Sequence, residues 1–225
     1  MTKASVAILG GSGAEGGGLA LRFAAAGYKV IIGSRDAAKA QEAANKIAQR
    51  LPQASVYGAD NQSAAGQAGV VILTVPFGAQ RSTLESVRTQ LHGKILVDVT
   101  VPLVPPKASQ VQLPEDHSAA IGAQKLLGEG VKVVSAFQNV SAHQLEHLGE
   151  PVDCDVLVCG DDKDAREMVV RMARDAGLVS WHGGVLANSV AAEALTSVLI
   201  FMNRRYKVPG TGIRITGLGD AAEHG

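Results

Sequence analysis

Short apolar runs that are typical of buried strands alternate with longer helical runs, and this alternation limits the fold more than any other feature of the sequence. The runs ASVAILG (4–10), KVIIG (29–33) and VVILTVP (70–76) begin the series. Strands joined by helices make right-handed crossovers and form a parallel sheet that is covered on both faces. The pattern therefore predicts an α/β fold with a doubly wound parallel sheet. Helices are expected near residues 17–26, 36–51, 62–68, 79–91 and 118–127, and further strands at 54–59, 94–100 and 132–137.

The pattern loosens after about residue 140, where a second part of the chain begins. One more strand (153–160), one helix (161–177) and a long apolar-faced helix with a basic end (188–207) follow. We predict a Rossmann-type nucleotide-binding domain over residues 1–142 and a smaller C-terminal lobe over residues 143–225. That lobe is expected to contribute to the pocket of a second substrate and to offer a surface for oligomerisation. In the alternative organisation, the DVLVC strand extends the first sheet.

Composition and charge exclude several classes of partner and compartment. The 225 residues carry 21 basic and 21 acidic side chains, so no overall field attracts nucleic acid or an anionic membrane. The N-terminus enters a strand without a signal pattern, and no apolar stretch reaches about 18 residues. Cys154 and Cys159 share one buried-strand pattern, which favours core thiols over a disulfide. We expect a cytoplasmic protein.

A glycine-rich loop between the first strand and the first helix contains the pattern GxGxxG. Its glycines are Gly11, Gly13 and Gly16. Gly11 is expected to allow a tight turn, Gly13 to let backbone amides approach a pyrophosphate, and Gly16 to let helix and strand pack closely. The helix N-terminus then offers free N–H groups to the phosphates. In this context the loop predicts a dinucleotide site, and the alternative is a structural turn.

The end of the second strand decides which dinucleotide is preferred. An acidic residue at this point normally binds the ribose 2′-hydroxyl of NAD. Ser34 and Arg35 lie there instead, and Ser34 comes 18 residues after Gly16. A guanidinium and a hydroxyl suit the 2′-phosphate of NADP, and Lys39 adds a second cation one helical turn later. The site is therefore predicted to bind NADP(H). In the alternative, Arg35 is a surface residue paired with Asp36.

Several stretches of the sequence together resemble the NADPH-dependent oxidoreductases of the 8-hydroxy-5-deazaflavin coenzyme F-420. The matching stretches run nearly end to end: LGGSGAEGGGLALRFAAAGYKVIIGSRD, LTVPF, VPLVPP, VVSAF, DVLVCGDD, ANSVAAEALTSVLI and GTGIRI. The resemblance implies hydride transfer between NADP(H) and a small-molecule deazaflavin or flavin. It also implies a cytoplasmic homodimer or higher homo-oligomer.

The resemblance implies roles for individual residues as well. Those around the pyrophosphate would be Ser12, Gly13, Ala14 and Glu15, and those on the 2′-phosphate Ser34, Arg35 and Lys39. Val75 and Ala79 would border the adenosine and ribose, Val104 and Ala142 the nicotinamide, Gln138 and Val140 the deazaflavin, and Thr211 the meeting of the rings. Two departures stand out. Glu15 replaces a neutral residue, so its side chain is expected to point to solvent, and Gln138 with Asn139 replaces a histidine-led pair.

Hydride transfer between two flat rings needs stacking and exclusion of water more than it needs an acid or a nucleophile. We therefore assign no catalytic side chain and no metal ligand. The anionic tail of the deazaflavin has a candidate site in Arg204, Arg205, Lys207 and Arg214. In the alternative, these cations are solvated charges at a helix end, where they suit the helix dipole.

Other functions are compatible with the same sequence. They are a reductase of another flavin, or of a metal ion through a flavin; an imine or keto-acid reductase with a proton donor; and a non-catalytic NADP sensor. HQLEH (143–147) also matches an inverted zinc-protease pattern, for which the plainer interpretation is the start of a helix. Asp161 or Asp162 is expected to cap the helix that follows them.

Overall fold

The computed structural model describes residues 3–218, and eight strands in that range form one sheet. The strand order is β3-β2-β1-β4-β5-β6-β7-β8. The strands from β3 to β6 in this order are parallel, β7 is antiparallel to β6, and β8 is parallel to β7. Their bounds are β1 Val6–Leu9, β2 Val30–Ser34, β3 Val56–Asp60, β4 Val70–Leu73, β5 Ile95–Asp98, β6 Lys132–Ser135, β7 Val156–Gly160 and β8 Ser180–Gly184.

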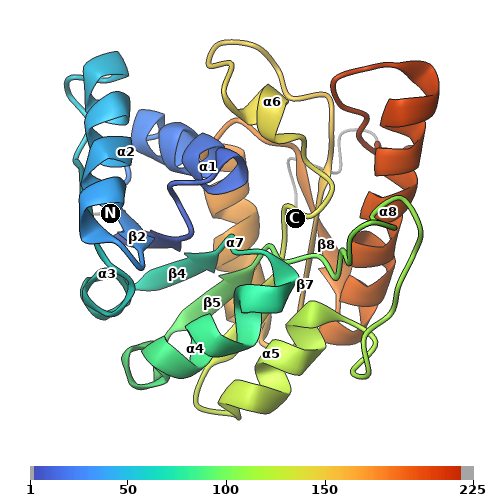
Figure 1. The fold of residues 1–225 in the computed structure, drawn as a ribbon, viewed down its shortest axis with the longest axis horizontal. Coiled ribbons are helices and arrows are strands. Elements are labelled where there is room, and N and C mark those ends of the chain that lie inside the picture. The colour runs from blue at the N-terminus through green and yellow to red at the C-terminus, as the bar shows by residue number, and fades with distance from the viewer. Residues whose placement is uncertain (1–2, 219–225) are drawn as a thin grey trace.

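Helices connect these strands and cover both faces of the sheet. Figure 1 shows α1 and α2 on one side of the strands and α4 and α5 on the other. The helices are α1 Ala14–Ala25, α2 Ala37–Arg50, α3 Asn61–Gln67, α4 Phe77–Leu91, α5 Ala119–Leu127, α6 Ala142–Leu145, α7 Lys163–Asp175 and α8 Ser189–Tyr206, with a short 3₁₀ turn at Leu186–Asn188. The predicted doubly wound α/β fold is confirmed.

Successive side chains of the central strand β1 enter two different hydrophobic clusters. Val6 and Ile8 of β1 pack in the cluster that includes residues of α1, α2 and α7. Ala7 and Leu9 pack in the cluster that includes residues of α3, α4 and α5. All four side chains are fully buried. Because both faces of a parallel sheet are covered, its strands appear in the sequence as unbroken apolar runs, which is why they could be located without a structure.

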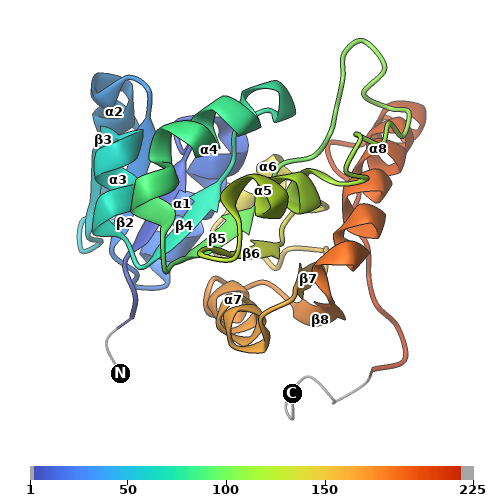
Figure 2. The same cartoon turned by 90° about the horizontal axis from the view of Figure 1, so that it is seen from below.

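The longest helix, α8, lies beside β7 and β8, at the end of the molecule opposite α2 (Figures 1 and 2). It buries Glu193 but exposes Val198, Phe201, Met202 and Tyr206 to solvent. Within residues 3–218, Leu186–Tyr206 is the one helical segment whose length and composition would allow it to cross a membrane, and 33% of its apolar window is buried. No such segment was expected from the sequence. Length and composition alone are equally typical of a helix packed in a soluble protein.

The sheet continues across residue 142 without a break, as in the alternative organisation considered above. The direction of the strands changes there, because Val134 pairs with Gly160 and Ser135 with Cys159 in antiparallel register. The sequence pattern had not indicated the direction of this added strand. The connection from β6 to β7 contains only the four-residue α6 and makes no helical crossover of the kind that joins parallel strands. The division into two domains at residue 142 stays a prediction.

Several local predictions about caps and thiols are confirmed. Asp162 caps α7 by accepting a hydrogen bond from the Ala165 amide at 2.8 Å. Asp161 accepts instead from the Leu186 amide and so fastens the 3₁₀ turn to the start of α7. Cys154 and Cys159 are free and buried.

Candidate dinucleotide and substrate site

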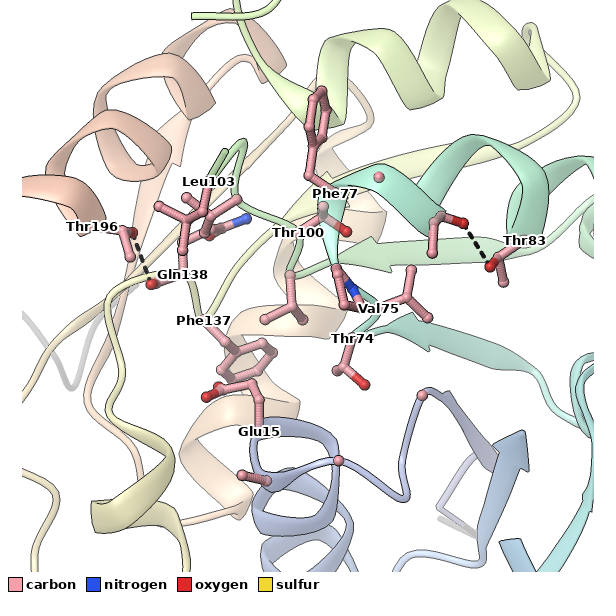
Figure 3. Close-up of a pocket in the computed structure, with 18 of the residues that line it drawn as sticks. Glu15, Thr74, Val75, Phe77, Thr83, Thr100, Leu103, Phe137, Gln138 and Thr196 are labelled. Atoms are coloured by element: carbon pink, nitrogen blue, oxygen red, sulfur yellow. Dashed lines mark hydrogen bonds between the residues drawn. The ribbon is translucent and has the colours of Figure 1, made fainter. Parts of the chain in front are cut away.

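A pocket of about 970 Å³ lies at the carboxyl ends of the parallel strands (Figure 3). Doubly wound sheets bind their ligands at this edge. The volume lies at the upper end of the range for small-molecule sites. The lining comes from residues 10 and 12–15 of the glycine loop, 34–35 after β2, 74–79 after β4, 99–101 and 103–105 after β5, and 137, 138 and 140 after β6, together with Asn61, Ser82, Thr83, Ala108 and Thr196.

The glycine loop turns sharply after β1 and delivers the open end of α1 to the pocket. Gly10 has a φ of +84°, so it is this residue, directly before the predicted turn residue Gly11, that adopts the left-handed conformation. A Cβ on Gly16 would lie 2.4 Å from Thr74 Oγ1 and 2.7 Å from Gly11 Cα, which confirms its predicted role in close packing. Gly13 is the N-cap and provides no side-chain hydrogen bond, so the first amides of α1 stay available to a ligand.

Ser34 and Arg35 line the pocket at the end of β2. Asp36 does not pair with Arg35. Its carboxylate caps α2 by accepting hydrogen bonds from the amides of Ala38 and Lys39. The Arg35 guanidinium is exposed and is the one cation among the described residues that line the pocket. Lys39 lies on the first turn of α2, exposed and outside the lining.

The other residues implied by the resemblance divide into two groups. Val75, Ala79, Val104, Gln138 and Val140 all line the pocket. Ala142 and Thr211 do not, because other contacts hold them. Ala142 begins α6, which packs against α1. The amide of Thr211 donates to Asn203 Oδ1 at 2.7 Å, and this bond ties the C-terminal segment to α8. This arrangement does not favour direct contact of Ala142 or Thr211 with the bound rings.

The structure adds pocket residues that the sequence did not reveal. Phe137 lies under the pocket with a φ of +74°, a conformation that non-glycine residues rarely adopt. Thr196 of α8 fixes this turn by donating a hydrogen bond to the Gln138 carbonyl oxygen at 2.9 Å (Figure 3). Thr196 is 58 residues away from Gln138 in the chain, and a threonine in an apolar helix carries no local signal of such a role.

Three buried polar atoms that line the pocket have no hydrogen-bond partner within the described chain. They are Glu15 Oε1, Asn61 Oδ1 and Gln138 Oε1. The Thr100 side chain hydrogen-bonds the Asp98 carboxyl behind the pocket. Buried polar groups in folded proteins are almost always paired, so an unpaired group that faces a pocket is a candidate for contact with a ligand. Asn61 lies toward the Arg35 end, because its Oδ1 would be 3.0 Å from a Cβ on Gly33. Gln138 lies three residues after the end of β6.

Glu15 does not point to solvent as expected. Its side chain lies toward Phe137, inside the pocket (Figure 3). Burial raises the pKa of this carboxyl from 4.5 to about 8, and the side chain has no ion pair or hydrogen bond with the described residues. The expectation was wrong because the residues that cover Glu15 are more than 120 positions later in the chain.

Behind the pocket, two buried carboxyl groups hold the strand ends and α8 in place. Asp98 accepts hydrogen bonds from Gln80 Nε2 at 2.5 Å and from the Thr100 amide at 2.9 Å. Glu193 accepts from the amides of Ala119 and Ala120 at 2.6 and 3.1 Å, so α8 is fastened to the N-terminus of α5. Burial raises the pKa of Asp98 to about 6 and that of Glu193 to about 8, against the opposing effect of these hydrogen bonds.

The histidine pair does not form a metal site among the described residues, and part of the basic cluster is engaged within the chain. α6 ends at Leu145, and the Nδ1 atom of His147 lies 2.7 Å from the His143 carbonyl oxygen. No three histidine, cysteine or acidic side chains gather into a possible metal site within residues 3–218. Arg214 pairs with Asp153 at 2.6 Å. Arg204 contacts Ser109 of the 101–117 segment, and its role toward an anionic tail stays a prediction.

An α/β enzyme that binds a dinucleotide is the class that this sheet, glycine loop and pocket define. Residues 5–102 match the family model described as "NADP oxidoreductase coenzyme F420-dependent". The chain is 45% identical over 221 residues to an F420-dependent NADP reductase of Methanocaldococcus jannaschii, an alignment that covers 95% of this chain and 98% of the relative. It is 44% identical over 220 residues to the enzyme of that name from Methanothermobacter thermautotrophicus, with 95% of each chain covered.

A solved structure has the same fold. It is described as a "putative f420 dependent nadp-reductase" from an Arthrobacter species, with a TM-score of 0.78, 24% identity, and coverage of 96% of this chain and 100% of that one. The chain belongs to the family of F420-dependent NADP reductases.

Proposed function

We propose that the protein transfers a hydride between NADP(H) and the deazaflavin coenzyme F-420. The observation that carries the proposal is the 45% identity to an F420-dependent NADP reductase along almost the whole of both chains. The nicotinamide and the deazaflavin supply the hydride donor and acceptor when they are bound. The protein contributes binding, orientation of the two rings and exclusion of water.

The groups at the β1 and β2 end of the pocket fit a phosphorylated dinucleotide. The uncapped amides of α1 suit a pyrophosphate, and the Arg35 guanidinium with the Ser34 hydroxyl suits a 2′-phosphate. Asn61 Oδ1, buried and unpaired, offers an acceptor to a donor group at the same end. These contacts support NADP(H) as the dinucleotide and would hold its far end while the nicotinamide reaches the middle of the sheet edge.

The other end of the pocket fits flat rings with polar edges. Leu103, Phe137 and Val140 supply apolar walls that exclude water. Gln138 Oε1 is unpaired beside those walls, and an N–H group on a bound ring would satisfy this acceptor. The described residues of this slot include no histidine, lysine or tyrosine. The chain's own residues there position the rings, and the described lining of the whole pocket offers none of these three side chains as a proton donor for imine or keto-acid reduction.

Rapid mixing of the enzyme and NADPH with different acceptors tests the reaction directly. The deazaflavin coenzyme should lose its absorbance at about 420 nm within a turnover, and an ordinary flavin at the same concentration should react much more slowly. Faster reduction of the flavin would instead favour the related flavin or metal reductases. Tight binding of NADPH without reduction of either acceptor would favour a non-catalytic NADP sensor.

We further propose that the protein is a cytoplasmic homo-oligomer in which the solvent face of α8 pairs with a second copy. This face consists of Val198, Phe201, Met202 and Tyr206. Four neighbouring apolar side chains on one helix make a contiguous exposed patch, and such patches mark interaction surfaces. A self-complementary patch on a helix is the usual basis of a two-fold dimer.

A further inference from the structure

Glu15 is an acidic residue in a place where a bound dinucleotide would put its own negative charges. It lies on the first turn of α1, immediately after the loop whose amides face the pocket. Among the described residues that line the pocket, Glu15 is the one carboxyl group and Arg35 the one cation. Arg35 follows β2 and makes no ion pair with Glu15. A carboxylate beside a pyrophosphate, without a cation, would weaken binding by charge repulsion.

The surroundings of Glu15 favour the neutral acid over the carboxylate. The Oε1 atom is buried and unpaired, and burial alone accounts for the raised pKa of about 8. The titratable group that interacts with it is the Cys154 thiol, whose own pKa is also raised by burial. Two carboxylates flank that thiol, and both have other partners, since Asp153 pairs with Arg214 and Asp155 accepts from Trp181. Arg214 is occupied by Asp153, and no described cation pairs with Glu15.

We propose that Glu15 binds the dinucleotide as a carboxylic acid, donating an O–H hydrogen bond to a phosphate or ribose oxygen. A neutral carboxyl has one donor, and the described chain offers no acceptor to it. The ligand supplies the missing acceptor, and the negative charge of the ligand holds the proton in place. Glu15 is thus a cofactor-binding side chain, in addition to the backbone of its loop. This inference rests on the proposed NADP(H) site and does not depend on which acceptor is reduced.

Binding of NADPH is therefore coupled to one proton. Below about pH 8 the proton is already present and affinity is constant, whereas at higher pH it must be taken up on binding. The dissociation constant is expected to rise about tenfold between pH 7 and pH 9. In Glu15→Gln, a neutral amide with a fixed N–H donor, it should stay constant over this range. Fluorescence titration of NADPH into the full-length protein measures the dissociation constants of the wild type and of Glu15→Gln. The control is Glu42→Gln, which removes the same charge at an exposed position on α2 and should behave as the wild type.

Calorimetry of the unmodified protein tests the proposal without any variant. At pH 8.5, in two buffers with different ionisation enthalpies, NADPH binding should take up about three quarters of a proton. Affinity of the wild type that is equal at pH 7 and pH 9.5, or proton uptake near zero, would overturn the role of Glu15. A loss of affinity at high pH that persists in Glu15→Gln would overturn it as well. If NADPH fails to bind at any pH, the proposed function itself fails, which is a different result.

Discussion

Arg35 and Glu15 line the same pocket, but the sequence predicted the position of the Arg35 side chain and not that of the Glu15 side chain. The place of Arg35 follows from local order alone, because a strand, a glycine loop, a helix and a second strand bring residue 35 to the sheet edge. Glu15 is equally close to the loop, yet its burial depends on Phe137 and its neighbours, which fold over it from the other half of the chain. A position fixed by neighbours in sequence was predictable, and one fixed by distant residues was not.

We expect Arg35 to determine the preference for NADPH over NADH. Arg35→Asp removes a donor for the 2′-phosphate and adds a charge that repels it, whereas the ribose hydroxyl of NADH gains an acceptor. Hydrogen bonds to a charged group contribute about 1.5–3 kcal/mol, so the Michaelis constant for NADPH should rise by about ten- to a hundredfold. The constant for NADH should change far less. Lys46→Asp, which changes the same charge further along α2 on an exposed face, is the control. Equal effects on the two dinucleotides would contradict the assignment.

At the scale of elements, the helices and strands of the first 135 residues lie close to where their periodicity predicts them. Their limits depend on local signals, such as the Asp36 cap of α2 and the Ser118 cap of α5. The antiparallel β7 and the contribution of α8 to the pocket were not predictable in this way. They depend on contacts across the chain, such as Thr196 with the Gln138 carbonyl and Asn139 Nδ2 with the Ala192 carbonyl.

The attachment of α8 to α5 depends on one carboxyl group. Glu193→Ala leaves the amides of Ala119 and Ala120 without their buried acceptor, and each unsatisfied buried donor is costly. The free energy of unfolding should fall by about 2–4 kcal/mol in urea denaturation. Glu193→Gln keeps one carbonyl acceptor and should lose less. A loss below about 0.5 kcal/mol in the alanine variant would mean that water replaces the carboxylate and that α8 is held by its other contacts.

At the scale of the whole molecule, the exposed face of α8 lies at one end and the dinucleotide-binding loops lie at the other (Figure 2). An association through α8 would therefore leave the glycine loop and Arg35 accessible. The same face also contributes to the apolar character of Leu186–Tyr206. Such an exposed apolar surface can associate with a second copy of the protein or adsorb to lipid. The mass of the protein in solution distinguishes these two cases.

Phe201 lies on this face and is exposed over 55% of its surface. Light scattering of the wild type should give the mass of a dimer or a larger oligomer, and Phe201→Glu should shift it toward the monomer, because a buried unpaired charge at an interface is strongly unfavourable. Val179→Glu, at an exposed apolar residue just before β8, should leave the mass unchanged. A monomeric wild type would contradict the proposed oligomer, and sedimentation with lipid vesicles would indicate a membrane surface instead.

The reversal of strand direction between β6 and β7 affects which parts of this fold can evolve a new substrate specificity. Beyond β6 no strand points its carboxyl end toward the pocket. The part of the pocket assigned to the second molecule is therefore formed by loop residues 99–101, 103–105, 137, 138 and 140 and by Thr196 of α8. The residues that bind the phosphates of the dinucleotide and the residues that select the second molecule thus belong to separate segments of the chain. Substitutions confined to α8 and these loops can therefore change which second molecule is bound, while the residues that bind the dinucleotide stay the same.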